Sequence, residues 1–378
     1  MKILIINTLY HPFKVGGAEV SVQFLAEELV ASGERVRVIC LHDLSERKQT
    51  TLNGVEVVYL PLKNLYWPFD YESKGKISKI AWHILDNYNP LMAKVVGREL
   101  DEFSPDVVHT NNISGFSVSV WDEVKERNIR LVHTTRDYYL FHHNCTLFSD
   151  GSNMDASSKK IRALSYIKRL KSQKVDAFVG ISKYISNLHK DNGYAFGEKH
   201  SYIYNPIKQL SINNNVSSQI RIGFIGRLTA DKGFSEFCTI AEKMSNYTDV
   251  EFCAAGRLAN TPEGEGLRDL ANRSKVKLLG FVPVDKYLAD IDILLLPTKW
   301  NEPFGRVVAE GASAGKHVFT TFMGGIKEVA SFYDNVHEIS EFNIETIRRV
   351  MATPISLPKN KPFDVMSLSA LYKNIYKA

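Results

Sequence analysis

The sequence is poor in cysteine and has no long apolar run. Its four cysteines are Cys40, Cys145, Cys238 and Cys253, and no C-x-x-C pair occurs. This pattern favours neither a zinc site nor a disulfide framework, and it fits a reducing cytoplasm. No apolar run approaches the roughly 18 residues that a membrane-spanning helix needs. The apolar part of residues 1–7 is too short for a signal peptide, so we expect a first strand there.

A strong charge bias is also absent. The net charge is +5, from 47 Lys and Arg against 42 Asp and Glu, which is too mild to indicate a nucleic-acid partner. Hydrophobic residues make up 44% and charged residues 24% of the 378 residues, as in ordinary globular proteins with sizeable cores. The length predicts two or three domains. No cofactor is predicted.

Short apolar segments alternate with helical patterns along the whole chain. Segments of the first half that are expected to form strands are 3–6, 35–40, 55–60, 106–109, 130–134, 177–181 and 201–204. A second series comprises 220–225, 250–255, 276–279, 293–296 and 318–320. This alternation predicts an α/β protein with two Rossmann-like, doubly wound parallel-sheet domains that face each other across a cleft. The polar stretch 211–219 marks the linker between them.

The most informative stretch is 300–311, which follows the apolar segment 293–296. Pro303 and Gly305 indicate a loop, and 306–314 is expected to form a helix. The N–H groups of residues 305–308 would form the helix N-terminus, which favours an anion. Glu302 precedes this helix and Glu310 lies inside it, so the two carboxylates could face groups on either side of the anion. A nucleotide sugar has that layout, with sugar hydroxyls, a diphosphate and a ribose diol.

Two glycine-containing loops could also approach a phosphate. Gly16 and Gly17 lie at a strand-to-helix turn and offer backbone N–H donors; a plain tight turn is the alternative. In the second half, Arg227 and Lys232 lie in a loop from residue 226 to Gly233. They would place two cations where a diphosphate leaving group accumulates charge, although solvated surface charges would give the same pattern.

These motifs together resemble a known family. The sequence E-P-F-G-x-x-x-x-E from Glu302 to Glu310 resembles the E-x7-E motif of retaining glycosyltransferases of family 4, which have the GT-B fold. The element G-R-x-x-x-x-K-G at 226–233 is similar to another element of that family. The loop containing Phe281 and Val282 resembles the one whose backbone contacts the nucleotide base, and 324–328 continues the likeness. The resemblance is strongest from 221 to 330.

The resemblance implies a specific reaction and specific donor contacts. A hexose-type sugar would pass from a nucleoside diphosphate sugar to an acceptor hydroxyl with retained anomeric configuration, by front-face substitution. Glu302 and the backbone of Phe304 and Gly305 would hold sugar hydroxyls, and Glu310 the ribose. Arg306 and Val307 would complete the donor site at the helix N-terminus. The expected domains are 1–205, 206–357 and a terminal helix in 358–378 that crosses back to the first domain.

Polar residues follow two expected strands of the first half. Asn111, Asn112 and Tyr138 are expected to contact the acceptor. Members of the family commonly have a histidine where this sequence has Arg136. We predict that Arg136 orients donor hydroxyls or holds a phosphate or carboxylate, with a structural pairing to Asp137 as the alternative. The neighbouring strand-end histidines at 109 and 133 could be core residues with satisfied hydrogen bonds.

A metal ion is not expected at the site. The D-x-D sequence at Asp290 and Asp292 runs directly into the apolar segment 293–296, which favours a helix end over a manganese site. Residues His142, His143 and Cys145 do not have the spacing of a standard metal site, and an acceptor loop is the better interpretation. Arg227, Lys232 and the helix N-terminus would supply the positive field that a metal otherwise provides.

Two segments raise the question of a membrane partner. From Lys159 to Lys174 the chain carries seven cations and no acid, with apolar residues every third position. It could dock on anionic lipid or be an amphipathic helix packed on the sheet with a solvated basic face. The aromatic and lysine residues within 61–100 equally suit a membrane interface, a bulky acceptor or a helical pair on the sheet. The expected location is cytoplasmic, with peripheral attachment to the inner membrane face as a further hypothesis.

Two other functions are compatible with the same fold. A nucleotide-sugar 2-epimerase would need acid and base residues around C2 of the sugar, and it would lack an acceptor loop. A sugar-nucleotide-binding protein without catalysis is favoured only if the change to Arg136 is inactivating. The preferred hypothesis remains a transferase whose partners are a nucleotide-sugar donor and a carbohydrate or lipid-linked acceptor.

Overall fold

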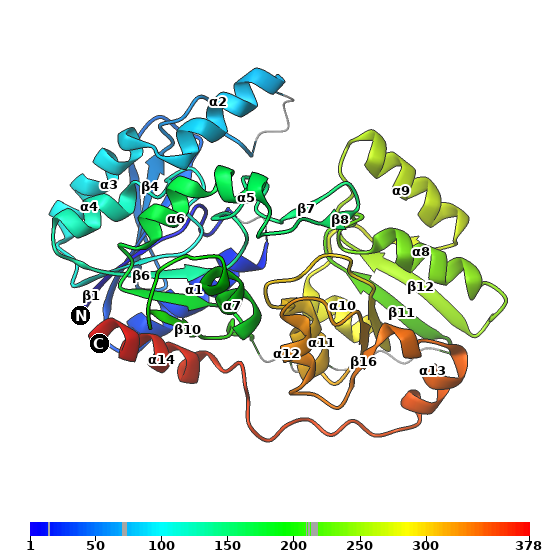
Figure 1. Ribbon diagram of the computed structural model, residues 1–378. Helices are drawn as coiled ribbons and strands as arrows, with labels where there is room; N and C mark the ends of the chain where they lie inside the picture. Colours follow the sequence, from blue (N-terminus) through cyan, green and yellow to red (C-terminus); the bar gives the residue numbers. More distant parts are fainter. Residues whose placement is uncertain (14–15, 70–73, 209, 211, 213–217) are drawn as a thin grey trace. The chain divides into compact units, whose positions relative to one another are not determined.

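The computed structural model describes residues 1–13, 16–69, 74–208, 210, 212 and 218–378 (Figure 1). The chain divides into two compact units. The first comprises Met1–Leu147, Asp155–Pro206 and Phe363–Ala378, and the second Phe148–Met154 and Ile207–Pro362. Each unit is built on a mainly parallel sheet, so the predicted α/β class with two parallel-sheet domains is confirmed. Of the predicted linker 211–219, residues 211 and 213–217 lie outside the described part of the chain.

The first unit contains an eight-stranded sheet in the order β10-β9-β6-β5-β1-β2-β4-β3. Its strands are β1 Lys2–Ile6, β2 Arg35–His42, β3 Lys48–Leu52, β4 Val55–Pro61, β5 Val107–Thr110, β6 Arg130–Thr135, β9 Ala177–Gly180 and β10 His200–Tyr202. Only the β3–β4 pairing is antiparallel among these neighbours. The short strand β3 was not expected, because four of its five residues are exposed and its sequence lacks an apolar run.

The helices of the first unit are α1 Gly17–Ala31, α2 Lys76–Asn87, α3 Pro90–Phe103, α4 Val120–Glu126, α5 Lys159–Leu164, α6 Tyr166–Ser172, α7 Lys183–Asp191 and α14 Val365–Lys377. Local capping explains several of their starts. For example, the Asn89 side chain accepts hydrogen bonds from the N–H groups of Leu91 and Met92, and Pro90 occupies the first helical position. The basic segment forms two short helices that meet at Ser165, rather than one.

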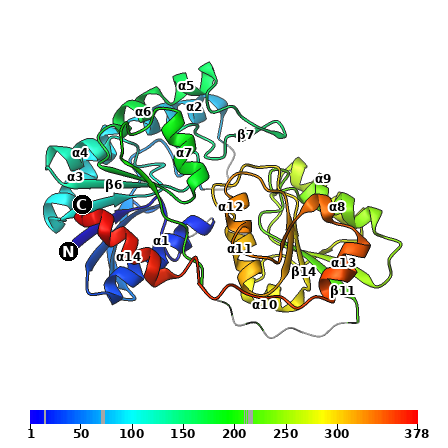
Figure 2. The same cartoon turned by 60° about the horizontal axis from the view of Figure 1, so that its bottom comes forward.

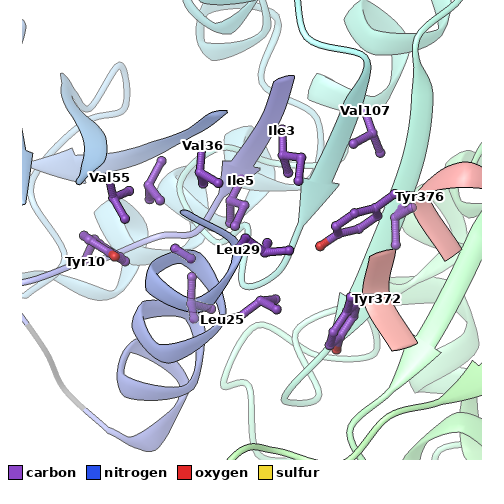
Figure 3. Packing of buried hydrophobic residues seen from close by; sticks show 14 of the residues in the cluster. Ile3, Ile5, Tyr10, Leu25, Leu29, Val36, Val55, Val107, Tyr372 and Tyr376 are labelled. Atoms are coloured by element: carbon purple, nitrogen blue, oxygen red, sulfur yellow. The ribbon is translucent and has the colours of Figure 1, made fainter. Parts of the chain in front are cut away.

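The core of the first unit joins the two ends of the chain. Ile3 and Ile5 point from β1 toward Leu25 and Leu29 of α1 (Figure 3). From α14 at the other end of the chain, Tyr372 and Tyr376 enter the same cluster, with exposed fractions of 2% and 4%. The terminal helix is therefore part of the hydrophobic core of the first unit.

The second unit contains a six-stranded parallel sheet in the order β13-β12-β11-β14-β15-β16. Its strands are β11 Ile220–Ile225, β12 Val250–Ala255, β13 Lys277–Leu278, β14 Ile293–Leu296, β15 His317–Thr320 and β16 Val336–Glu338. The helices are α8 Phe234–Lys243, α9 Pro262–Arg273, α10 Val284–Asp290, α11 Arg306–Ser313, α12 Ile326–Ala330 and α13 Ile344–Met351, with a 3-10 turn at Ile339–Glu341. The strand order reverses between β11 and β14. In open α/β sheets, ligands bind at such a switch point, outside the carboxyl ends of the strands.

A small hairpin from the first half of the sequence belongs to the second unit. It consists of β7 Phe148–Ser149 and β8 Ser152–Asn153, which pair antiparallel. Nothing in the sequence pattern predicted it, since each strand has two residues and no apolar alternation.

Candidate active site

The loops after β11 and β14 are joined at the switch point of the second unit. The carbonyl of Asp231 accepts hydrogen bonds from the N–H groups of Lys299 and Trp300, at 3.0 and 3.1 Å. Gly233 has a φ of +79°, and a Cβ there would lie 1.8 Å from the carbonyl oxygen of Pro297. This close approach requires glycine. The two motifs that the sequence singled out therefore form one continuous structure.

The central contact of this structure is an ion pair between Lys232 and Glu302. The Lys232 side chain is 20% exposed and that of Glu302 is 19% exposed, so solvent and small ligands can reach both. The Lys232 ammonium also lies 4.3 Å from the centroid of the Trp300 ring, an attractive cation–π contact. A cation and a carboxylate thus lie together where the strand order reverses.

The Glu302 backbone contacts Gly324 and Gly325, the two glycines of the segment 324–328. The N–H of Gly325 donates to the Glu302 carbonyl at 2.7 Å. A Cβ on Gly324, whose φ is +61°, would lie 2.4 Å from the same oxygen. This contact gives a physical reason for the Gly-Gly sequence that the family resemblance included.

Glu310 lies just over one turn into α11 and is 8% exposed. Burial raises the pKa of its carboxyl group, while Arg306 acts in the opposite direction. The Arg306 Nε donates to Glu310 Oε1 at 2.7 Å. The Arg306 side chain thus orients the carboxylate of Glu310. A donor-binding role for Arg306 at the helix start remains a prediction.

The first turn of α11 begins at Gly305, which has a φ of +93°. The N–H of Ala309 donates to the Gly305 carbonyl at 3.2 Å, which is the hydrogen bond that closes the first turn. The N–H of Val307 therefore belongs to the first turn, where N–H groups have no partner within the helix. Phe304 is 2% exposed, so its ring is a core group.

The remaining predicted donor residues of this unit are more exposed. The Arg227 side chain is 51% exposed and pairs with Asp231 at 3.0 Å. Phe281 is 65% exposed, and the Arg257 guanidinium lies 5.5 Å from its ring centroid. Val282 follows it in the loop. Arg257 was not identified from the sequence; its position directly after Gly256, the residue that follows β12, is the signal that could have found it.

Asn153 of the β7–β8 hairpin is another residue that the sequence analysis missed. Its Nδ2 donates to the Lys299 carbonyl at 2.8 Å. Its Oδ1 accepts from the N–H of Asn301 at 2.9 Å. One side-chain amide therefore binds the backbone on both sides of Trp300, immediately before Glu302.

In the first unit, the two glycines precede α1 as expected. The Gly16 N–H, however, donates to the Glu19 carboxylate at 3.0 Å in a capping box. This donor is therefore already used within the helix start, and the nearby carboxylate opposes a second anion. Gly17 is the first residue of the helix. A donor-binding role for Gly16 and Gly17 remains a prediction.

Arg136 is buried, with 6% of its surface exposed. Its Nε donates to Asn111 Oδ1 at 2.8 Å and its Nη1 to Asn205 Oδ1 at 2.5 Å. The Asp137 carboxylate accepts instead from the N–H of Tyr139 at 2.8 Å. Two asparagine amides thus bind the guanidinium. A role of Arg136 toward donor or acceptor groups remains a prediction.

The three expected acceptor residues differ in their surroundings. Asn111 is 1% exposed, and its side-chain oxygen is the one bound by Arg136. The carbonyl of Asn112 accepts from the N–H of Thr8 at 2.7 Å, which joins the loops after β1 and β5. Tyr138 is 1% exposed and its hydroxyl donates to that of Tyr184 at 3.3 Å. The Tyr138 side chain is therefore part of the core. Acceptor contact by these three residues remains a prediction.

The strand-end histidines are core residues. His109 is hydrogen-bonded to the hydroxyls of Tyr376 and Thr134, both at 2.7 Å. His133 is hydrogen-bonded to Thr110 at 3.0 Å. Burial lowers the pKa of His133 to about 3, so this ring is neutral at physiological pH. Both histidines are thus buried and hydrogen-bonded, as the alternative interpretation of the sequence expected.

The D-x-D sequence has a structural role. Asp290 ends α10, and Asp292 Oδ2 accepts from the N–H of Arg221 at 2.7 Å. Within the described ranges, no group of three or more His, Cys, Asp or Glu side chains is placed to hold a metal ion. Among the helices of the described residues, none combines the length and the apolar character needed to cross a membrane.

Solved structures share this fold over the whole chain. Sucrose-phosphate synthase from Thermosynechococcus elongatus superimposes with a TM-score of 0.76 at 16% identity, covering 100% of this chain and 98% of that one. HepE from Anabaena, solved with UDP and glucose, gives 0.72 at 17% identity and covers 100% of both chains. With its two parallel-sheet domains, the protein has the GT-B fold of these glycosyltransferases.

Sequence comparison gives the family. The model of Glycosyltransferase Family 4 matches residues 15–208, and that of glycosyl transferases group 1 matches 219–341. A Klebsiella pneumoniae protein, described as an uncharacterized 42.6 kDa protein in the cps region, is 41% identical over 379 residues and covers 100% of both chains. An uncharacterized glycosyltransferase of Methanocaldococcus jannaschii is 26% identical over 359 residues, 87% of this chain and 82% of that one. The protein belongs to the GT-B glycosyltransferases of this family.

Proposed function

We propose that the protein is a retaining hexosyltransferase that uses a nucleoside diphosphate sugar and an acceptor hydroxyl. The observation that carries this proposal is the joined pair of loops at the switch point of the second unit. Lys232 and Glu302 lie together there, and the buried carboxylate of Glu310 follows on α11. The joined loops and α11 thus carry a cation that can bind phosphate, a carboxylate that can accept hydrogen bonds from sugar hydroxyls, and a carboxylate that can accept them from a ribose diol.

Each residue then has a defined part in donor binding. Glu302 and the backbone of Phe304 and Gly305 hold sugar hydroxyls. Lys232, together with Arg227, faces the diphosphate, and the N-terminus of α11 contributes N–H donors. Glu310, oriented by Arg306, accepts hydrogen bonds from the ribose diol. Bound diphosphate competes with Glu302 for the Lys232 ammonium, which releases the carboxylate for the sugar.

The reaction is a front-face substitution at C1 of the sugar. The bond from C1 to the phosphate oxygen breaks, and the bond from C1 to the acceptor oxygen forms on the same face. The acceptor proton passes to the departing phosphate oxygen, so no strong protein base is needed. Lys232 and Arg227 stabilise the negative charge that develops on this oxygen. Because these cations supply the field, we expect full activity in the presence of a strong chelator.

The acceptor is a carbohydrate or a lipid-linked carbohydrate of polysaccharide or glycoconjugate assembly. The relative in the cps region supports this assignment. The structure of HepE with UDP-glucose makes UDP-sugars the first donors to test. We further propose a cytoplasmic location for the protein, with attachment to the membrane surface near the segment from Lys159 to Lys174.

A panel of UDP-, GDP- and ADP-sugars tests the function. The enzyme is incubated with each donor, with and without carbohydrate acceptors, and both free nucleotide diphosphate and sugar products are measured. Release of nucleotide diphosphate with formation of an α-linked product from an α-linked donor supports the proposal. A new sugar epimer would indicate the 2-epimerase, and binding without turnover would indicate a sugar-nucleotide-binding protein without catalysis. A product with inverted anomeric configuration would contradict retention.

A further inference from the structure

Helix α2 presents an apolar face to solvent. Ile77, Ile80 and Ile84 are 84%, 60% and 67% exposed. Their spacing of three and four residues places all three on one side of the helix. A surface helix of a globular protein normally turns such a stripe toward the core. Scattered exposed apolar residues need no explanation, but a contiguous stripe indicates an interaction site.

The opposite side of α2 fixes this orientation. Trp82 and Asp86, one turn apart, are 3% and 2% exposed. The Trp82 Nε1 donates to the Tyr66 carbonyl at 2.9 Å. Asp86 Oδ1 accepts from the N–H of Gly115 at 2.6 Å. Turning the isoleucines inward would break both contacts, so the apolar face is a stable feature of the fold.

The basic helices α5 and α6 have the same outward apolar character. Leu164, Ile167 and Leu170 are 43%, 41% and 56% exposed. Of the four apolar residues of the expected stripe, only Ile161 is buried, with 1% of its surface exposed. The charged Lys168 is buried as well, with 3% exposed. The interpretation of this segment as a helix that packs its apolar side on the sheet is therefore wrong for three of its four apolar residues.

Contacts shared through Tyr139 and Tyr88 place the end of α2 near α6. The Tyr139 hydroxyl donates to the Asp86 carbonyl of α2 at 2.9 Å, and the Lys168 ammonium of α6 donates to the Tyr139 carbonyl at 2.8 Å. The Lys171 ammonium lies 4.8 Å from the centroid of the Tyr88 ring, at the end of α2. Figure 2 shows α2, α5 and α6 along the same border of the first unit.

The exposed charges on these three helices have one sign. They are Lys76, Lys79, Lys159, Lys160 and Arg162, whereas the exposed Lys174 after α6 pairs with Asp122 of α4. The segment 159–174 contains no acidic residue, and the one acid of α2, Asp86, is buried. An apolar stripe with cations beside it and no exposed acid among these helices complements an anionic, apolar surface. These are the features of interfacial helices that lie on anionic bilayers.

We propose that α2, α5 and α6 form a bilayer-docking face. The three isoleucines of α2 enter the boundary between headgroups and acyl chains, and the cations of α5 contact lipid phosphates. This inference goes beyond sugar transfer and does not depend on it. It refines the proposed attachment through 159–174, because the most exposed apolar side chains are those of α2, which carries no such basic run.

The test is co-sedimentation of the full chain with vesicles of phosphatidylcholine, alone or mixed with phosphatidylglycerol. The variant Ile77→Ser/Ile80→Ser/Ile84→Ser removes the apolar face without touching the core. We expect its partition onto anionic vesicles to fall by at least about tenfold, since binding scales with buried apolar area. The matched control, Met351→Ser/Leu357→Ser/Met366→Ser, replaces three apolar residues that are 41%, 46% and 67% exposed. It should bind like the wild type.

A second variant separates charge from apolar area. Lys159→Gln/Lys160→Gln/Arg162→Gln should weaken binding to anionic vesicles and reduce its sensitivity to salt, because fewer lipid phosphates are neutralised. Its binding to pure phosphatidylcholine should not change. Circular dichroism and donor turnover without vesicles show whether each variant is folded, and they also test the transferase function independently of docking.

Several outcomes would overturn the docking face. Wild-type protein that does not bind vesicles, or binds equally with and without phosphatidylglycerol, contradicts it. So does an isoleucine variant that binds like the control. If the wild type is a dimer, the isoleucine variant a monomer and neither binds vesicles, the face is covered by a second copy of the chain instead.

Discussion

The side-chain oxygen of Asn153 accepts a hydrogen bond from the N–H of Asn301 at 2.9 Å, although 148 positions separate the two residues. The same Asn153 amide donates to the Lys299 carbonyl. The backbone that leads to Glu302 is thus bound by the hairpin on one side and by the Asp231 carbonyl on another. We interpret Asn153 as a positioning residue for Glu302.

Asn153→Ala should therefore raise the KM for the donor by about tenfold or less, since a partly exposed pair of hydrogen bonds contributes about 1 kcal/mol. The affinity for free nucleotide diphosphate should hardly change, because Glu302 is assigned to the sugar. Steady-state kinetics and calorimetry measure the two quantities. Ser152→Ala, in the same hairpin, is the control. Equal kinetic constants for both variants would refute the positioning role.

Glu310→Gln should weaken binding of the donor and of nucleotide diphosphate by about 1–3 kcal/mol, the range for a buried hydrogen-bonding group that loses its partner. The amide still accepts from Arg306, so the fold should persist. Isothermal titration measures the effect, with the exposed Glu265→Gln of α9 as control. Unchanged nucleotide affinity would mean that the ribose assignment is wrong.

The same residue predicts a pH dependence. Burial raises the pKa of Glu310, so its carboxylate takes up a proton at a higher pH than an exposed glutamate, whose pKa is about 4.3. Donor affinity should fall on acidification through this raised pKa, and Glu310→Gln should lose that part of the pH profile. The contribution of Glu310 to stability has the opposite direction, because a raised pKa favours the folded state at acid pH and this gain is lost as pH rises.

Lys232→Ala should mainly lower kcat, because charge on the leaving diphosphate develops in the transition state. The variant also frees Glu302 from its ion pair, so the KM for the donor should change less than turnover. Initial rates at saturating donor give the result. Lys243→Ala, an exposed lysine of α8, is the control. Normal turnover of Lys232→Ala would count against a role in leaving-group departure.

Arg136→Ala should cut transfer by at least about tenfold while nucleotide affinity stays nearly intact, if the guanidinium acts on the reacting groups. Arg136→Lys should rescue poorly, because a point charge does not replace a planar fork. Since Arg136 binds Asn205, urea unfolding is measured in parallel, with Asn205→Ala for comparison. Loss of stability in both variants with full transfer activity would leave Arg136 a purely structural role.

Tyr376→Phe should reduce the free energy of unfolding by about 1–3 kcal/mol, because it leaves a ring nitrogen of buried His109 without its hydrogen bond. The hydroxyl and His109 Nδ1 are 2.7 Å apart. Urea unfolding followed by tryptophan fluorescence measures the change, and Lys377→Ala at the exposed end of α14 is the control. Stability equal to the wild type would show that solvent or another group satisfies His109.

Much of this molecule is encoded locally. The segment 293–296 is a continuous apolar run, and 220–225 and 250–255 are each apolar apart from one charged residue near the start. The structure has strands with these same bounds. The helix expected after Gly305 also forms where the pattern placed it. Buried parallel strands and helix starts depend on neighbouring residues, so a sequence can specify them without knowledge of the fold. The spacing of Glu302 and Glu310 follows from the same local geometry.

What the tertiary structure decided are the partners that come from distant parts of the chain. Arg136 contacts Asn205, Asn153 contacts Asn301, and Tyr376 contacts His109. The outward orientation of the apolar face of α2 is likewise decided by contacts with distant residues. Its periodicity shows that one side is apolar, but not which side packs. Only Trp82 and Asp86, through their contacts with Tyr66 and Gly115, turn the isoleucines outward. Amphipathic spacing is the same for a helix that faces its core and for one that faces away, and long-range contacts determine which of the two forms.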